Sequence, residues 1–201
     1  MDLSGDDRKL IQRFFEHSDE QSLQLLFGRY MRPIHSFLLR LTASPQDADD
    51  LTQETFLKVW KNLKRFKQDQ SFKSWLFSIA HHTAIDWFRK RRNVPFSSFE
   101  DDEGNNVLFE TLKDDVELPW VFLDRKDAVD ILRKVLFELP PSSREILILR
   151  HESEMTFEEI GEILHEPLNT VKSRYRRSLL ILRERFLALP DDNAPKITAS
   201  P

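Results

Sequence analysis

The sequence predicts an all-α protein made of two small helical domains that are joined by an acidic linker. Apolar residues recur at three- and four-residue steps along most of the 201-residue chain, which is the period of an amphipathic helix. Only four residues are glycine, and no Asn-Gly or Asp-Gly turn separates strand-like segments. A β fold is therefore poorly supported.

The first predicted domain spans residues 1–93 and is expected to be helical from Asp6 to Lys90. Ser44 can cap a helix that starts at Pro45, since serine is a preferred N-cap and proline suits the first helical position. Ser71 can cap a further helix, which ends in the cationic run 89–92, where the helix dipole favours positive charge. The inward face of the helix after Ser44 is expected to carry Ala48, Leu51, Thr55, Val59 and Leu63.

An acidic linker is predicted over residues 94–124, where helix-breaking residues and carboxylates replace the helical pattern. Its aromatic and aliphatic residues are too many for a simple spacer, so we expect parts of the linker to dock on another surface. These residues are Phe96, Phe99, Leu108, Phe109, Trp120 and Phe122.

The second predicted domain spans residues 125–189 and is followed by a tail, 190–201, that is expected to be disordered. Either Ser142 or Ser143 is expected to cap its helix after Pro141. Further along, Thr156 and Glu159 have the spacing of a capping box.

The end of this domain has the pattern of a helix-turn-helix: a short capped helix, a turn and a longer basic helix that starts near Asn169. In such a unit the second helix enters the major groove of DNA. On a helical wheel the apolar residues Val171, Tyr175, Leu179 and Leu182 form one stripe, and the cations lie away from it. The alternative is a solvated basic face in an ordinary helical bundle.

Two segments resemble the conserved domains of bacterial RNA polymerase sigma factors, and the extracytoplasmic-function (ECF) subfamily matches best. The segment LPPSSREILILRHESEMTFEEIGEILHEPLNTVKSRYRRSLLILRERF resembles region 4, the domain that binds the −35 promoter element. The segment DADDLTQETFLKVWKNLKRFKQDQSFKSWLFSIAHHTAIDWFRKRRN resembles region 2, which binds core polymerase and the −10 element. The resemblance implies that the protein is a sigma factor. It further implies a linker that runs through the polymerase near the RNA exit path and, as in many relatives, an anti-sigma partner.

Three positions depart from the family pattern. Glycine is more common where His165 and Asn169 stand, and Arg-Asn is common where the chain has His81 and His82. Asparagine is a good helix cap, but histidine is less suited than glycine to a left-handed turn. The histidine pair affects the expected −10 base preference more than the expected fold.

An acidic and amide face on the helix after Ser44 suits docking onto a basic partner helix. The resemblance assigns this face to the clamp coiled coil of the largest polymerase subunit. The alternative is a solvated charged face. The expected polymerase-binding residues are Asp47, Asp50, Gln53, Glu54 and Leu57.

DNA binding is expected on two surfaces that combine cations for phosphates with polar groups for base edges. The expected −10 residues are Lys67, Gln68, Asp69, Gln70, Ser71, Lys73, His82, Arg89, Arg91 and Arg92. The expected −35 residues are Asn169, Thr170, Lys172, Ser173, Arg174, Arg176 and Arg177. The helically spaced aromatics Phe72, Trp75 and Phe88 are expected to lie in the core rather than stack on bases.

Enzymatic function classes find little support, so we expect no catalytic site, metal or cofactor. The chain lacks cysteine, a phosphate-binding glycine-rich loop and a serine nucleophile elbow. His82 and Asp86 are one helical turn apart, but no third metal ligand has a suitable spacing. The polar N-terminus and short apolar stretches predict a cytoplasmic protein without membrane insertion.

A formal charge of −4 predicts weak DNA binding by the chain alone, because affinity comes from cations placed against phosphates. Attachment to polymerase would raise the effective concentration at the promoter. Two other functions remain open on the residues alone. One is a free-standing helix-turn-helix regulator that binds operator DNA. The other is an adaptor that sequesters a basic partner through its acidic face.

Overall fold

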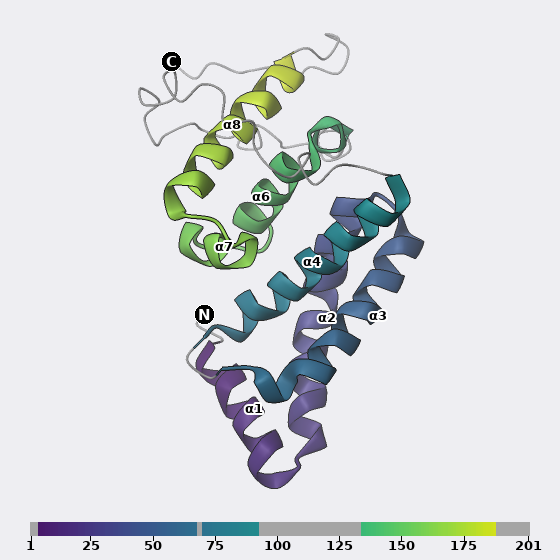
Figure 1. Cartoon of the computed structure of the whole chain (residues 1–201), viewed down its shortest axis with the longest axis vertical. Helices are drawn as coiled ribbons and strands as arrows, with labels where there is room; N and C mark the ends of the chain where they lie inside the picture. The colour runs from purple at the N-terminus through teal and green to yellow at the C-terminus, as the bar shows by residue number, and fades with distance from the viewer. Residues whose placement is uncertain (1–3, 68–69, 93–133, 188–201) are drawn as a thin grey trace, which may run out of the picture.

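A computed structural model describes residues 4–67, 70–92 and 134–187, and all regular elements in these ranges are helices. The first group comprises α1 (Ser4–His17), α2 (Glu20–Thr42), α3 (Pro45–Asn62), a 3₁₀ turn (Leu63–Arg65) and α4 (Phe72–Arg92). The second group comprises a short helical stretch at 134–138, α6 (Pro141–His151), α7 (Phe157–Leu164) and α8 (Leu168–Leu187). The predicted linker and the predicted disordered tail lie outside the described residues (Figure 1).

The helix starts at Ser44 and Ser71 are confirmed. The Ser44 hydroxyl accepts the backbone N–H of Asp47 at 3.3 Å, and Pro45 occupies the first helical position. The Ser71 hydroxyl accepts the N–H of Ser74, also at 3.3 Å. Each cap satisfies one of the backbone donors that a helix start leaves without an internal partner.

The predicted serine cap of α6 is wrong. The N-cap is Pro140, which makes no side-chain capping bond, and Ser142 and Ser143 are buried in the first turn. Pro141 takes the first helical position, where its fixed φ and missing N–H carry no penalty, so the helix begins before either serine.

Helices α1 to α4 pack around a core that contains the largest fully buried side chains of the first group, among them Leu26, Ile34, Phe37, Leu38 and Phe77. Asp7 is buried beneath this group and accepts hydrogen bonds from Arg29 and Tyr30. These bonds join α1 to α2, because a buried carboxylate is costly unless donors satisfy it.

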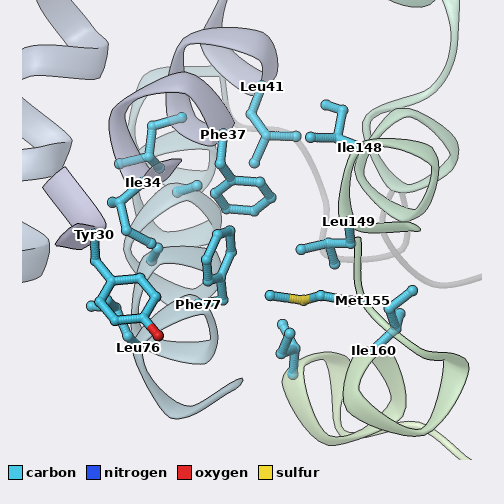
Figure 2. Packing of buried hydrophobic residues seen from close by; sticks show 14 of the residues in the cluster. Tyr30, Ile34, Phe37, Leu41, Leu76, Phe77, Ile148, Leu149, Met155 and Ile160 are labelled. Atoms are coloured by element: carbon cyan, nitrogen blue, oxygen red, sulfur yellow. The ribbon is translucent and has the colours of Figure 1, made fainter. Parts of the chain in front are cut away.

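The two groups of helices are not separate bodies, since α6 packs against α2 and α7 packs against α4. Their buried apolar side chains form one continuous cluster. Figure 2 shows this meeting point, with Phe37, Leu41 and Phe77 on one side and Ile148 and Met155 on the other. We call this contact of α6 and α7 with α2 and α4 the interdomain seam.

Candidate nucleic-acid interface

The turn before α8 positions the predicted recognition helix. The predicted capping box is present: the Thr156 hydroxyl accepts the N–H of Glu159, and the Glu159 carboxylate accepts the N–H of Thr156 at 2.8 Å. At the other end of α7, His165 adopts the left-handed conformation with φ 56°. This is the conformation for which glycine is the usual residue, so the departure at His165 is accommodated with some backbone strain.

Gly161 also shapes this turn, and the sequence interpretation did not single it out. A Cβ at Gly161 would lie 2.9 Å from the backbone oxygen of Glu166 and 3.8 Å from a Val171 methyl group. The absence of a side chain therefore lets the chain after α7 fold back closely. The sequence signal was a glycine inside a helical pattern, which often marks a close backbone approach.

The apolar stripe of α8 is confirmed, because Val171, Leu179 and Leu182 are buried and Tyr175 is half-buried. Tyr175 lies 2.8 Å from a ring nitrogen of His151 on α6 and packs against Phe157 of α7. These contacts fix the rotation of α8 about its own axis and hence the direction of its polar side chains.

The predicted −35 residues divide into two environments. Asn169 is exposed, and the others apart from Arg174 are partly exposed: Thr170, Lys172, Ser173, Arg176 and Arg177. The side chain of Arg174 is only 6% exposed and forms an ion pair with Glu166 in the turn. In this arrangement Arg174 holds the turn rather than facing solvent, whereas the wheel placed it beside the cationic face.

On α3, the predicted polymerase-binding face is open to solvent. Asp50, Gln53 and Glu54 are exposed, and Leu57 is 58% exposed although it is a large apolar residue. Trp60, one turn further along, is 53% exposed and extends the apolar part of this face. The sequence interpretation missed Trp60, although its spacing of three residues from Leu57 places it on the same face.

Asp47 differs from the other members of this set. Its carboxylate forms an ion pair with Arg91 of α4, and its backbone N–H completes the Ser44 cap. Hydrogen bonds from Ser44 and Arg91 hold the pKa of Asp47 below its usual value, against the opposing effect of burial. Asp47 thus joins the start of α3 to the end of α4, and less of its charge is available to a partner.

The predicted −10 residues lie along α4 and the segment before it. Lys67 and Gln70 are exposed and Ser71 caps the helix, while Gln68 and Asp69 lie outside the described residues. Lys73 reaches the second group of helices, where its ammonium donates to the backbone oxygen of Ser153 at 2.6 Å.

His82 lies near the middle of α4. One ring nitrogen is 2.6 Å from the backbone oxygen of Ser78, and the ring lies 5.3 Å from that of His165. Partial desolvation, with the nearby charges of His81 and His165, lowers the pKa of His82. Because a carbonyl oxygen can only accept, Nδ1 carries the N–H that bonds to Ser78, and Nε2 of the neutral ring is left as an acceptor, which suits a contact to a base edge better than a contact to a phosphate.

The cationic end of α4 makes contacts with its own helix and with α3. Arg89 pairs with Asp86, and the Arg91 guanidinium lies 5.1 Å from the centre of the Trp87 ring while it pairs with Asp47. Arg92 is the last residue of α4.

The expected core position of the aromatic residues on α4 is confirmed. Phe72 is 3% and Phe88 5% exposed, and Trp75 packs against Phe66 and Phe72 with ring centres 5.0 and 5.8 Å apart. These three side chains therefore support the fold of the first group of helices rather than offering stacking surfaces for bases.

The described residues contain neither a cluster of metal-ligating side chains nor a helix that could span a membrane. Within residues 4–67, 70–92 and 134–187, no three His, Asp or Glu side chains gather where they could hold a metal ion. Over the same part of the chain, no helix combines the length and apolar character that crossing a membrane requires.

Family models and curated relatives identify both halves of the chain. The Sigma-70 region 2 model matches residues 26–94, and the Sigma-70 region 4 model matches residues 135–184. The RNA polymerase sigma factor YlaC of Bacillus subtilis is 34% identical over 171 residues, which are 85% of this chain and 94% of that protein. The ECF RNA polymerase sigma factor SigW of the same organism is 27% identical over 84% of this chain and 90% of its own length.

Solved structures show the same fold at lower identity. The sigma factor RpoE of Bartonella quintana, in complex with the anti-sigma factor NepR, matches with a TM-score of 0.61 and 24% identity over 85% of this chain and 99% of that chain. CnrH, in complex with the cytosolic domain of CnrY, matches with a TM-score of 0.66 and 21% identity over 92% of this chain and 99% of that chain.

Proposed function

Because this chain belongs to the ECF group of RNA polymerase sigma factors, we propose that three of its surfaces divide the work of promoter recognition. The family role is to bind core RNA polymerase and to direct initiation from specific promoters, and it is the role of this chain. The observation that carries the assignment of surfaces is their order: an open acidic and apolar face on α3 precedes two cationic helices, α4 and α8.

The α3 face binds core polymerase in this proposal. Exposed Leu57 and Trp60 supply apolar surface, and Asp50, Gln53 and Glu54 surround it with acidic and amide groups. A basic helical partner complements this pattern, since opposite charge steers association and buried apolar side chains provide most of the affinity.

The −10 element is bound by α4 and the segment that leads into it. In this proposal Lys67 and Lys73 contact phosphates, Lys73 after release of its bond to Ser153, and Gln70 and the neutral ring of His82 contact base edges. The remaining proposed members of this surface are Gln68, Asp69, Ser71, Arg89, Arg91 and Arg92.

Helix α8 binds the −35 element in the major groove. Its exposed N-terminal residue Asn169 and its partly exposed cations carry the contacts to bases and phosphates. Within this set Arg174 has a positioning role, because its ion pair with Glu166 stabilises the turn from which α8 starts.

We further propose that the protein has no catalytic activity of its own, works in the cytoplasm with polymerase and is controlled by an anti-sigma factor. The net charge of −4 agrees with a subunit that depends on polymerase for DNA affinity. The two solved relatives were captured with an anti-sigma factor or with a cytosolic domain, which supports regulation by a protein partner.

Transcription with sigma-free core polymerase tests the assignment of surfaces. Promoter-library templates are transcribed with the purified chain, and the RNA 5′ ends are sequenced. We expect discrete starts that share −10 and −35 elements. Replacing Lys172 and Arg176 with Glu should abolish selection at −35, and the matched replacement of Arg183 and Arg185, exposed near the end of α8, should leave it intact.

The same experiment separates the alternative function. A free-standing regulator would give no specific transcripts with core polymerase and would bind operator DNA tightly by itself at physiological salt. Unchanged −35 selection after the Lys172 and Arg176 replacements would contradict the assignment of α8.

A further inference from the structure

The start of α8 differs in character from the cationic turns that follow it. Leu168 is the first residue of the helix and is 36% exposed, although it is a large apolar residue, and the sequence interpretation did not single it out. Asn169 follows it and is also exposed. Residues 168–171 are all uncharged, and the first cation of the helix is Lys172. The helix therefore begins with a neutral, exposed end.

Asn169 does not act as the helix cap that its residue type would suit. The backbone oxygen of Pro167 accepts the N–H of Val171 at 3.0 Å, which places Pro167 at the N-cap and Asn169 inside the first turn. Asparagine favours a helix interior less than alanine does, so Asn169 is not there for helix stability. Within the described residues, no hydrogen bond engages its side chain, and the amide donor and acceptor are available to an external partner.

The helical period places Asn169 on the proposed DNA-binding face. Lys172, Ser173 and Arg176 follow it at three, four and seven residues, which is one stripe along a helix. Leu168 lies four residues before Lys172, at the edge of the same stripe. Helical side chains tilt toward the N-terminus of their helix, so both residues project past the start of α8. In a helix-turn-helix, the N-terminal residues of the second helix are those that contact base edges.

Negative charge on the α7 side of Leu168 affects how DNA can approach this end. A shallow hollow beside Leu168 is lined by Glu158, Glu162 and Glu166. Glu166 is paired with Arg174, whereas Glu158 and Glu162 are exposed. Exposed carboxylates disfavour phosphates on this side, because like charges repel. The cations on the later turns of α8 then hold the DNA backbone, and the neutral start faces the bases.

The two side chains match the groups that an A·T pair displays in the major groove. An asparagine amide has one donor group and one acceptor, and adenine presents the complementary N7 acceptor and N6 amino donor. A leucine side chain offers only apolar surface, which suits the C5-methyl group of thymine. Guanine presents two acceptors and cytosine has no methyl group, so a G·C pair complements neither side chain as well.

We propose that Leu168 and Asn169 select an A·T-containing step within the −35 element. Asn169 hydrogen-bonds to an adenine, and Leu168 contacts the methyl group of a thymine beside it. The inference rests on the proposed function and deepens it, because it assigns a base preference to one end of the −35 surface. It belongs to this chain rather than to the family, in which glycine is more common at position 169.

Transcription from a promoter library with a randomised −35 element tests the proposal with the full-length chain and core polymerase. For the parent we expect enrichment of A at one position and of T beside it. Asn169→Ala should reduce discrimination at the A position by about tenfold, the size expected for loss of a bidentate contact. Asn169→Asp should shift the enrichment from A to C, because a carboxylate accepts from the cytosine amino group. Leu168→Ala should change the T position alone.

A stability measurement and a control variant separate base selection from loss of the fold. Alanine is a better helix former than asparagine, so Asn169→Ala should unfold at the same urea concentration as the parent or slightly above it. Arg183→Ala changes an exposed residue near the other end of α8 and should leave every −35 preference as it is in the parent.

Base analogues on one selected promoter identify the atoms that are contacted. Replacement of the adenine by 7-deazaadenine removes N7, and replacement of the thymine by uracil removes only the methyl group. Initial transcription rates at subsaturating polymerase should fall with 7-deazaadenine for the parent but not for Asn169→Ala. They should fall with uracil for the parent but not for Leu168→Ala.

A selective −35 element whose base preferences are unchanged in Asn169→Ala and Leu168→Ala would overturn the inference and leave the proposed function in place. Equal sensitivity of the parent and Asn169→Ala to 7-deazaadenine would also overturn it, and so would a parent −35 element without an enriched A. Absence of specific transcripts with the parent chain would instead overturn the proposed function, and this inference with it.

Discussion

The α3 face and the two proposed DNA surfaces differ in how much of them the folded chain leaves available. On α3, Leu57 and Trp60 are more than half exposed although both are large apolar side chains. On α4 and α8, by contrast, Lys73 donates to the backbone oxygen of Ser153, and Arg174 pairs with Glu166 in the turn before α8. The chain thus leaves the proposed polymerase-binding face exposed and uses part of the proposed DNA surfaces for internal contacts.

In the proposed function this difference leaves the α3 face accessible to polymerase, whereas the bond from Lys73 to Ser153 would have to break before Lys73 could contact a phosphate. An exposed apolar patch is tolerated in a free protein when a partner covers it for function. A cationic DNA surface that is engaged internally avoids non-specific binding to DNA, which depends on free cations.

The largest expected effect comes from removal of the Arg144 guanidinium, which holds α6 at the interdomain seam. It donates to the backbone oxygens of Leu136, Phe137 and Leu139 within the second group and to that of Leu41 across the seam. Arg144→Ala leaves these buried acceptors without their charged donor, so we expect the free energy of unfolding to fall by about 3 kcal/mol or more. Urea titration followed by circular dichroism measures this loss.

Arg40→Ala is the matched control, because Arg40 also crosses the seam but is 35% exposed. An exposed ion pair contributes about 0–1 kcal/mol, so this variant should unfold close to the parent. If Arg144→Ala were as stable as Arg40→Ala, the buried guanidinium would not be an anchor.

The second prediction concerns the open face. Leu57→Asp should weaken binding to core polymerase by about 10- to 100-fold, because burial of a leucine contributes about 1.5–3 kcal/mol and each 1.4 kcal/mol is a factor of ten. The stability of the free chain should not change, since Leu57 is 58% exposed. Fluorescence-based titration of labelled chain with core polymerase gives the dissociation constant.

Leu25→Asp provides the comparison for Leu57, because Leu25 is 65% exposed on α2 and lies outside the proposed face. Equal losses of affinity for the two variants would show that polymerase binding does not depend on the α3 face.

Local features of this fold could be predicted from the sequence, and features that depend on distant segments could not. The caps at Ser44 and Thr156 involve residues three positions apart, so their spacing alone identifies them. His81 and Glu145 are 64 positions apart, and helical periodicity carries no information about such a pair. Arg174 was placed beside the cationic face for the same reason: its partner Glu166 lies in a turn whose path the sequence pattern does not define.

A pair of glycines gives the third prediction. Gly161→Ala would push a methyl group to 2.9 Å from the Glu166 backbone oxygen, so the turn must shift at a cost of about 1–3 kcal/mol. In Gly28→Ala the new methyl group has no neighbour within 4 Å, and stability should rise by about 0.5–1 kcal/mol because alanine favours the helix. Urea titration compares the two, and stabilisation by both substitutions would contradict the close approach at Gly161.

The smallest expected effect is a pH dependence of the seam, centred on His81. Burial lowers the pKa of His81, but the charge and hydrogen bond of Glu145, with a further contribution from Glu166, outweigh burial and the opposing charge of Arg174. The net pKa lies above the ordinary value of 6.5. The ion pair therefore stabilises the interdomain seam fully below pH 6.5, and this contribution is lost as the pH rises through the raised pKa.

The test uses an Arg40→Cys/Glu152→Cys variant, in which a short bis-methanethiosulfonate reagent can join the two positions across the seam. Its cross-linking rate is measured between pH 6 and 9 and divided by that of a His35→Cys/Asp49→Cys control between α2 and α3, which corrects for thiol ionisation. We expect the normalised rate to fall with rising pH, and Glu145→Gln should flatten the profile because the neutral amide no longer favours the imidazolium. His151 does not interfere in this window: burial and the charge of Arg150 lower its pKa to about 4, so its protonation begins only under acid conditions. A normalised rate that rises with pH would show that the seam does not depend on a charged His81.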